Sequence, residues 1–447
     1  MAKEEKNYSF AMIAIVAIVA IVGLVVMFLG MKLTGNISIL TTPTISQASV
    51  NPGVITIGEA SKSSMIKSPA CIGEGKTIPV VANPPECCSG LKLIKPKLEN
   101  QLGIYGYCTA KCGNGICESA TESSYNCPED CKVIVTCNNC FDCTSKVNRA
   151  KSGSVVKLAN DIEGYTVYYD SWGNEFYRCI SWTGGNSKVT FDCNGHKIKG
   201  TRKADDGIDS VGEGIYITSN FSTVRNCKIL DYYTGIDIAA NNNLIEGNRF
   251  NNSNFNKTWM GYMKGILYLG KNNVISDNNF ESIPMGIQGG GTNNVIEKNN
   301  FTKVTHGISL IDYSNGHNNI IKDNKISKCY EGVYLQDTQN NTIVYNNISL
   351  GGIGISLIGY YSEDGASGNK IKNNIINNND AGIYIGNTAK NNILESNTVC
   401  YSKKYEDIRN SKIDNNNSGY KNICYKILNW SDQGVQGCTF NCPRDLV

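Results

Sequence analysis

Three aspartates, Asp205, Asp206 and Asp209, lie close together in the chain and could do chemistry as a group. Grouped carboxylates bind calcium through their oxygens, or serve as general acid and general base on a glycosidic bond. The competing interpretation is an acidic loop that is only solvated. His306, which precedes a glycine, is a further catalytic candidate, although the residue before the equivalent glycines varies and favours an outward-facing histidine without a role.

Aromatic residues beside carboxylates form a second group of candidates, for binding rather than catalysis. Such side chains suit sugar rings, which offer apolar faces and hydroxyl edges. They occur in insertions of the repeat described below, and the predicted ligand-binding residues are Asp312, Tyr313, Tyr360, Tyr361 and Glu363, with Trp259 and Tyr262. Ordinary surface tyrosines are the alternative in a chain that has 24 of them.

The cysteine-rich string CGNGICESATESSYNCPEDC, residues 112–131, contains a candidate calcium site. Calcium prefers several oxygen ligands on a cross-linked loop, and Asn114, Glu118, Glu122 and Asp130 would supply them. A solvated acidic surface is the alternative. We expect the cysteines to form disulfides rather than a zinc site, because so many cysteines indicate an oxidising compartment.

A repeat of 21–22 residues with occasional insertions must position these side chains. The motif Gly-[Ile/Val]-x-apolar begins at residues 214, 235, 265, 286, 307, 332, 354 and 382. The motif Asn-x-[Ile/Leu]-x-x-Asn-x-[Phe/Ile/Val] follows with its first asparagine at 243, 273, 294, 319, 341, 369 and 392. Short β-branched runs broken by Asn and Gly are typical of strands and turns, and the period predicts a parallel β-helix.

The 57 asparagines are explained by this repeat. We expect their columns to stack as hydrogen-bonded ladders and to supply the left-handed backbone conformation of tight corners. We also expect the residue before each repeat glycine to stack on its equivalent. A polar, tyrosine-rich column should face outward, formed by Tyr216, Asp237, Gln288, Ser309, Tyr334, Ser356 and Tyr384.

The N-terminal part predicts a membrane anchor. Residues 10–31 hold no charge, and a helix of this length spans about 33 Å, enough for the hydrocarbon core. A cleavable signal peptide is the alternative. Residues 1–9 would be a cytoplasmic tail, residues 32–70 an extended linker, residues 71–145 a cysteine-rich module, residues 146–399 the β-helix and residues 400–447 a disulfide-closed cap.

The 19 cysteines are expected to pair outside the cell, with at least one left over because the number is odd. The residues predicted to form disulfides are Cys71, Cys87, Cys88, Cys108, Cys112, Cys117, Cys127, Cys131, Cys137, Cys140, Cys143, Cys179, Cys193, Cys400, Cys424, Cys438 and Cys442. Cys179 with Cys193 is the pair we predict inside the solenoid. Cys329 is the predicted free thiol.

Residues 145–400, with SGSVVKLANDI, VTFDCNGHKIKG and the Gly-Ile and Asn-Ile coils, resemble the pectin-lyase-like superfamily. Within it they resemble the NosD-type, carbohydrate-binding and sugar-hydrolase-like repeats of archaeal surface proteins. The string 112–131 resembles the C-G-N-G-x-C-E modules of such proteins. The resemblance implies a mainly β, right-handed parallel β-helix of about ten coils. It implies little about chemistry, because this fold hosts lyases, hydrolases, epimerases, adhesins and spacers.

The NosD-type resemblance raises copper as a cofactor. Copper prefers His, Met or Cys ligands, and Met285 and His306 would lie on adjacent coils with Met263 near. The chain has only three histidines, so we do not expect a copper site. The sequence requires no cofactor, and calcium is the one that the carboxylate groups above could bind.

The predicted function is recognition. We expect a single-pass membrane protein with a cytoplasmic N-terminus and an extracellular β-helix that binds a polysaccharide, a cell-surface glycan or an envelope protein. A polysaccharide lyase or glycoside hydrolase is one alternative, and a structural envelope component is another. The net charge of +3 argues against a nucleic-acid partner. Asn-x-Ser/Thr sequons make the chain a candidate glycoprotein.

Overall fold

The computed structural model describes residues 77–79, 86–87, 91–94, 104–109, 132–169, 173, 175–184, 188–201, 212–252, 263–311, 316–360 and 363–443. The predicted anchor at residues 10–31, its cytoplasmic tail and the linker lie outside these residues. None of the helices in the described part is long and apolar enough to cross a membrane.

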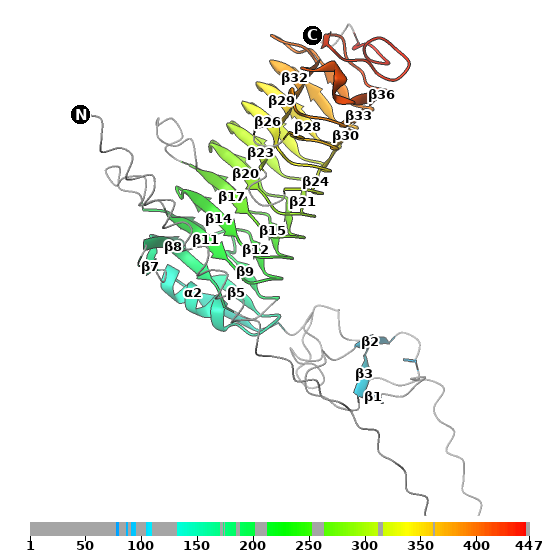
Figure 1. Cartoon of the computed structure of the whole chain (residues 1–447). Helices are drawn as coiled ribbons and strands as arrows, with labels where there is room; N and C mark the ends of the chain where they lie inside the picture. The colour runs from blue at the N-terminus through cyan, green and yellow to red at the C-terminus, as the bar shows by residue number, and fades with distance from the viewer. Residues whose placement is uncertain are drawn as a thin grey trace, which may run out of the picture. The chain divides into compact units, whose positions relative to one another are not determined.

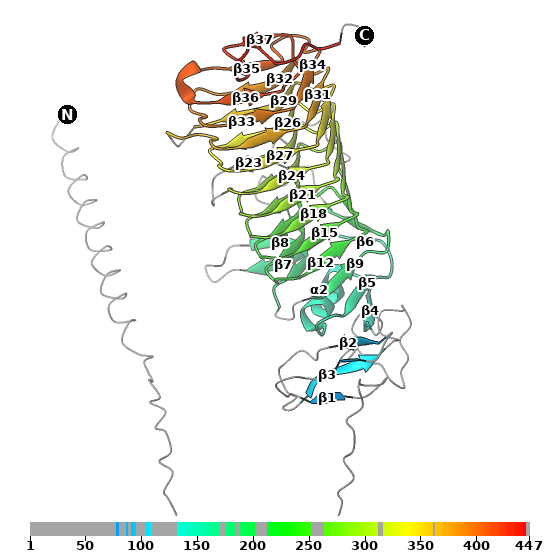
Figure 2. The same ribbon diagram turned by 90° about the vertical axis from the view of Figure 1, so that its right-hand side faces the viewer.

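Three long sheets form the walls of a parallel β-helix (Figures 1 and 2). Each coil contributes one strand to each wall, so neighbours in a sheet are one coil apart in the chain. Among the described strands of these walls, pairing is parallel except between β7 and β8. The colour in Figure 1 therefore runs steadily along the axis from β5 to β36. The predicted solenoid is confirmed.

Sheet 1 contains, in spatial order, β7 (Thr166–Tyr169), β8 (Glu175–Trp182), β11 (Glu213–Ile217), β14 (Thr234–Ile238), β17 (Lys264–Tyr268), β20 (Met285–Gly289), β23 (His306–Ile311), β26 (Glu331–Gln336), β29 (Ile353–Ile358), β32 (Ala381–Ile385), β35 (Ile408–Asn410) and β37 (Ile427–Leu428). Sheet 2 contains β4 (Ile134–Cys137), β5 (Val155–Leu158), β9 (Thr190–Asp192), β12 (Thr223–Arg225), β15 (Leu244–Glu246), β18 (Val274–Ser276), β21 (Val295–Glu297), β24 (Ile320–Lys322), β27 (Thr342–Val344), β30 (Lys370–Lys372), β33 (Ile393–Glu395) and β36 (Ser418–Tyr420). Sheet 3 contains β6 (Ile162–Glu163), β10 (Lys197–Lys199), β13 (Lys228–Leu230), β16 (Arg249–Asn251), β19 (Asn279–Glu281), β22 (Asn300–Thr302), β25 (Lys325–Ser327), β28 (Asn347–Ser349), β31 (Ile375–Asn377) and β34 (Thr398–Cys400).

The core consists of apolar columns that run along the axis. Phe250, Phe280 and Phe301 stack with ring centroids 4.8 and 4.7 Å apart and nearly parallel planes. Their spacing is that of neighbouring strands, so each coil adds one ring to the column. The side chains in the Ile245, Ile275 column of sheet 2 are fully buried. The apolar columns predicted from the repeat are therefore inside the solenoid.

The repeat glycines are needed because two columns approach each other closely. A Cβ on Gly286 would lie 2.5 Å from the carbonyl oxygen of Gly307 and 2.6 Å from Cδ1 of Phe301. Neither backbone nor a stacked ring can move away easily in a close-packed interior. The glycine motif and the Phe/Ile motif, read separately along the chain, thus meet across the core.

The asparagine columns form the predicted ladders. In one of them Asn278 donates from Nδ2 to Oδ1 of Asn299 at 3.1 Å, and Asn299 donates to Oδ1 of Asn324 at 3.1 Å. The backbone N–H of each also donates to the next Oδ1, as from Asn278 to Asn299 at 3.0 Å. The buried amides of this ladder are satisfied by the neighbouring coil, which removes the cost of burying them, whereas Nδ2 of Asn243 in the other column is buried without a partner.

The prediction that the ladder asparagines adopt the left-handed conformation is wrong. The residue before each one adopts it, such as Asn272 with φ 57°, Lys298 with φ 55° and Tyr345 with φ 58°. The preceding residue makes the turn at the surface, and the asparagine behind it points inward along the ladder. Because the side chain at the turn position points to the surface, Lys and Tyr also occur there, although Asn tolerates the left-handed conformation better.

The N-terminal end of the solenoid is covered by α2 (Cys140–Arg149), whose N-cap is Asn139. Disulfides join Cys137 to Cys143 and Cys140 to Cys179 of β8. Because β4 pairs with β5, the solenoid begins at Ile134, so Cys137, Cys140 and Cys143 belong to it rather than to the cysteine-rich module.

The predicted pair Cys179–Cys193 is wrong. Cys193 and Cys227 follow the paired strands β9 and β12, so they stack at one corner and form a disulfide with Cα atoms 4.7 Å apart. Cys227 is thus a disulfide cysteine that the sequence does not predict. Cys329, by contrast, is confirmed as a buried free thiol within the described residues, and burial raises its pKa to about 11.

At the C-terminal end, β35, β36 and β37 extend sheets 1 and 2 beyond residue 399, so the coils continue into the predicted cap. The 3-10 helix η2 (Ile413–Asn415) lies between them. Disulfides Cys400–Cys442 and Cys424–Cys438 cross-link this end. The Asp432 carboxylate ends one ladder, because Asn422 donates to it from Nδ2 at 2.7 Å and from its backbone N at 2.8 Å.

A separate antiparallel sheet, in the order β1 (Thr77–Pro79), β3 (Ile104–Thr109) and β2 (Lys92–Ile94), belongs to the cysteine-rich module. Cys87 and Cys108 are disulfide-bonded there. The other module cysteines predicted to pair lie outside the described residues, namely Cys71, Cys88, Cys112, Cys117, Cys127 and Cys131.

Candidate functional site

The outer face of sheet 1 carries most of the polar side chains that the repeat analysis singled out. The predicted outward column is in register, for example Asp237 beside Leu267, Gln288 beside Ser309, and Tyr334 beside Ser356. The residues before the repeat glycines also stack as predicted, such as Met285 beside His306. We call these two columns the outer strip. The strip is not exposed throughout, because Glu331 is buried, and the prediction that Ser309 and Ser356 face outward to solvent is wrong, since both are buried.

A charged cluster occupies the N-terminal part of the outer strip. Arg178 of β8 donates from Nε to Oε2 of Glu213 at 2.6 Å, and its guanidinium carbon lies 3.6 Å from the ring centroid of Tyr216. Asp237 of β14 contacts Glu213, and Lys264 of β17 lies close enough to act on its charge. Three successive coils and β8 therefore bring two carboxylates, a guanidinium and an amine together.

The Asp237 carboxyl is held partly neutral. Burial raises its pKa to about 7, and the nearby Glu213 carboxylate adds to the increase, while Arg178 and Lys264 act against it. Its oxygen Oδ1 is buried without a hydrogen-bond partner. Burial lowers the pKa of Lys264, although Asp237 opposes this. Two carboxyl groups that share a proton can accept and return one, which is the requirement for acid–base chemistry.

Sequence reasoning listed Asp237 in the outward column but did not connect it with Glu213. The contact is diagonal, because Glu213 pairs in register with Thr234 and Tyr216 pairs with Asp237. The stacking of the two outer columns was the signal that could have found the pair. Neither column alone shows it.

His306, the catalytic candidate of the sequence, lies near the middle of the outer strip. Its Nε2 is 3.1 Å from Oε2 of Glu331 on the next coil. The ring of Tyr334 meets the imidazole edge-on, with centroids 5.8 Å apart. His306, Glu331 and Tyr334 together could hold a proton or bind a ligand hydroxyl. The coil that begins at Met285 separates them from the charged cluster.

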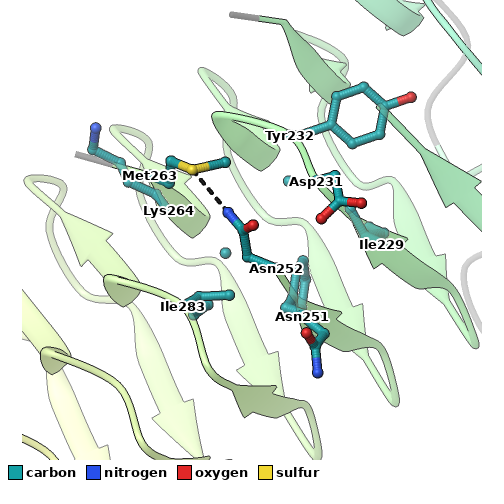
Figure 3. A pocket seen from close by; sticks show the side chains of 11 residues that line it. Ile229, Asp231, Tyr232, Asn251, Asn252, Met263, Lys264 and Ile283 are labelled. Atoms are coloured by element: carbon teal, nitrogen blue, oxygen red, sulfur yellow. Dashed lines mark hydrogen bonds between the residues drawn. The ribbon is translucent and has the colours of Figure 1, made fainter. Parts of the chain in front are cut away.

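Of the three residues considered for copper, Met285 and His306 lie in register on adjacent coils, but Met263 does not join them. Met263 precedes β17 at an inner corner, where its sulfur accepts a hydrogen bond from Asn252 Nδ2 at 2.8 Å (Figure 3). His306 is engaged with Glu331, which leaves Met285 without a second soft ligand. In the described part of the chain, no group of three or more His, Cys, Asp or Glu could hold a metal ion. The described residues do not fit a copper centre.

The remaining predicted residues are mostly outside the described ranges. These are the aspartates Asp205, Asp206 and Asp209, the aromatic and acidic residues Trp259, Tyr262, Asp312, Tyr313 and Tyr361, and the calcium candidates Asn114, Glu118, Glu122 and Asp130. Tyr360 and Glu363 are described and exposed, and 71% of Tyr360 is accessible to solvent. The backbone N of Tyr360 donates to Asp337 Oδ1 at 3.1 Å, which anchors the start of this insertion.

Comparison with known proteins supports the NosD-type resemblance for part of the chain. Residues 194–364 match the family model described as Periplasmic copper-binding protein (NosD). None of the curated proteins matches the sequence. The archaeal type and the cysteine-rich module resemblance stay predictions.

Several solved structures are similar at low identity. The Dettilon tailspike protein is 17% identical with a TM-score of 0.43, over 65% of this chain and 60% of that one. The periplasmic alginate epimerase AlgG is 14% identical with a TM-score of 0.41, over 65% of this chain and 68% of that one. The tailspike protein of E. coli bacteriophage HK620, solved in complex with a pentasaccharide, is 10% identical with a TM-score of 0.44, over 62% and 55%.

Proposed function

We propose that this protein is a membrane-anchored extracellular receptor that recognises glycans along the outer strip of sheet 1. The observation that carries the proposal is the column in which Gln288, Tyr334 and Tyr384 recur in register on that face. Tyr334 and Tyr384 are two coils apart, about 10 Å at the strand spacing of a sheet. Aromatic faces and polar edges repeated at this distance suit the rings and hydroxyls of an oligosaccharide.

The test uses the purified full-length chain on an array of neutral and acidic glycans. We expect at least one glycan class to bind, and Tyr334→Ala to weaken that binding several-fold by removing an aromatic face of the strip. Tyr345→Ala is the matched control, because Tyr345 is 60% exposed at the corner between sheets 2 and 3. Absence of binding to every glycan would overturn the proposal, as would equal losses in both variants.

The proposed location has its own test. The apolar segment 10–31 and the cross-linked solenoid favour an extracellular ectodomain on a retained anchor. A membrane-impermeant amine reagent added to intact cells should label lysines of the solenoid and not Lys3 or Lys6. Labelling of Lys3 and Lys6 without the solenoid lysines would reverse the orientation.

A second candidate function, cleavage of a polysaccharide, is favoured by the Glu213–Asp237 pair. One carboxyl can hold a proton for a leaving group while the other, ionised, accepts one. Incubation with neutral and acidic polysaccharides should then release new reducing or unsaturated ends, and Asp237→Asn should abolish the release while glycan binding at the C-terminal coils persists. Release that is unchanged in both Asp237→Asn and Glu213→Gln would exclude this pair as the catalytic centre.

A further inference from the structure

A cavity of about 380 Å³ opens on the last coils of the outer strip. Its volume would hold roughly a dozen waters at about 30 Å³ each, so a ligand of several heavy atoms fits. Its aromatic and apolar lining residues are Tyr330, Tyr384, Tyr405, Ile353, Ala381 and Ile383. The position before the repeat glycine is Lys264, Met285, His306 and Glu331 on four successive earlier coils and becomes Ile353 and then Ala381 here, so it carries no ionisable side chain at this point.

Residues 401–407 form the outer wall of the cavity, which is rigid before any ligand binds. The buried carboxylate of Asp407 holds this segment in place. Oδ1 accepts from the backbone N of Ser402 at 3.0 Å, and Oδ2 accepts from those of Tyr425 and Lys426 at 2.9 and 3.0 Å. The Cys400–Cys442 disulfide lies at the base of the segment. Such preorganisation lowers the entropy that a ligand must lose on binding.

The charges that line the cavity balance. Lys404 pairs with Asp380 at 2.7 Å, and Arg409 Nη1 lies 3.9 Å from Glu406 Oε2, so two cations face two anions. Glu406 Oε2 and Arg409 Nε are buried and have no hydrogen-bond partner. A ligand does not reach these two atoms, but the Arg409 and Glu406 side chains are 43% and 27% exposed, so their other polar atoms can bind adjacent hydroxyls, which donate and accept.

Tyrosine rings supply the remaining part of the recognition surface. Tyr330 and Tyr405 are 65% and 56% exposed, which is high for side chains of this size. The Arg409 guanidinium carbon lies 5.8 Å from the ring centroid of Tyr384, so a cation and an aromatic face border the same space. Rings on several sides and paired polar groups suit a pyranose better than a lipid chain, which would leave those polar groups unsatisfied.

We infer that this cavity binds a neutral pyranose residue of a glycan, with Tyr384 and Tyr405 against its apolar faces and Arg409 and Glu406 on its hydroxyls. The inference rests on the proposed glycan recognition and names its main binding site and ligand class. A balanced lining gives no advantage to a uronate or sulfated sugar, because each cation is already opposed by an anion. The glycan then continues from the cavity towards Tyr334.

The experiment measures affinity of the full-length chain for neutral oligosaccharides and for uronate oligosaccharides of equal length by calorimetry. We expect neutral probes to bind at least several-fold more tightly. Tyr384→Ala and Tyr405→Ala should each weaken neutral binding roughly tenfold, the loss of one aromatic contact, and Tyr384→Phe should restore it. Tyr345→Ala is the control and should leave both the affinity and the thermal unfolding temperature unchanged.

A charge variant separates ligand recognition from structural damage. Glu406→Gln changes the lining from balanced to one net positive charge, so uronate binding should rise several-fold while neutral binding falls. If wild type prefers uronate probes, the ligand class is wrong. If neutral binding survives Tyr384→Ala and Tyr405→Ala but is lost in Tyr334→Ala, the cavity assignment fails and the proposed function stands. If no probe binds, both fail.

Discussion

At the scale of single residues, Asp237 shows what burial on a sheet face does to an ionisable group. Its folded pKa of about 7 lies above the ordinary value of 3.8, so the folded state binds a proton more tightly than the unfolded state. The stability that this protonation contributes is fully present below about pH 4 and is lost as pH rises through about 7. The cause is the burial of Asp237 and its contact with Glu213.

We therefore predict that Asp237→Asn removes this pH dependence. Relative to the variant, the wild-type protein should lose on the order of 2–4 kcal/mol of unfolding free energy between pH 4 and 8, at about 1.4 kcal/mol per pKa unit. Denaturant unfolding at several pH values measures the difference. Asp277→Asn, at an exposed turn, should follow the wild type. A constant difference between Asp237→Asn and wild type across this range would contradict the prediction.

At the scale of structural elements, the asparagine ladder is a chain of mutually dependent hydrogen bonds. Asn299 donates from Nδ2 to the carbonyl oxygen of Ile275 and to Oδ1 of Asn324, and its own Oδ1 accepts from Asn278. Truncating it leaves buried donors and an acceptor unpaired on two coils. Each unpaired group costs about 1–3 kcal/mol, which is more than the bond itself was worth.

Asn299→Ala should accordingly lower the unfolding free energy by roughly 3 kcal/mol. The neighbouring Asn300 is a close control, because it is only half-buried and its side chain donates to Asn279 alone. Asn300→Ala should cost less than about 1 kcal/mol. Chemical denaturation of both variants tests this, and equal losses would mean that the ladder adds nothing beyond an ordinary hydrogen bond.

The close approach between the repeat glycines and the stacked phenylalanine rings can be tested by substitution. Gly286→Ala should destabilise the protein by about 1–3 kcal/mol, because its Cβ would meet both a carbonyl oxygen and the stacked Phe301 ring. Gly434 has φ 83° with nothing within 4 Å of a Cβ, so Gly434→Ala tests backbone strain without the collision. Thermal unfolding should show the larger loss at Gly286, and the reverse order would refute the packing explanation.

At the scale of the whole molecule, the solenoid needs closed ends, because an open end exposes strand edges that can pair with another chain. At the N-terminal end, α2 is tied to β8 by the Cys140–Cys179 disulfide, and Asn148 of α2 donates to the carbonyl oxygen of Ser181 at 2.8 Å. At the other end one asparagine ladder stops at Asp432, whose carboxylate replaces the next asparagine. The length between the ends is what gives a long binding face.

Cys140→Ser with Cys179→Ser should loosen the N-terminal end. Opening a loop of this length removes about 4 kcal/mol of chain-entropy stabilisation. We expect limited proteolysis to cut first within residues 138–150 and size-exclusion chromatography to show association through the exposed edge. The Cys424→Ser, Cys438→Ser variant, which opens a shorter loop at the other end, should leave α2 protected. If α2 is still protected from proteolysis in the Cys140→Ser, Cys179→Ser variant, packing alone holds α2 on the end of the solenoid.

The sequence by itself determined the β-helix, its apolar and asparagine columns, the register of the outer strip and the free Cys329. It could do so because one repeat sets which residues stack, and every coil restates the same spacing. Tertiary structure decided the contacts that cross columns or coils of unequal length. The Glu213–Asp237 pair is diagonal, Cys193 meets Cys227 through strand register rather than proximity in sequence, and the cavity combines Tyr330, Tyr384 and Tyr405 from different coils. A repeat predicts neighbours along a column, but contacts between columns depend on side-chain directions and on the path of each insertion, which only the folded chain specifies.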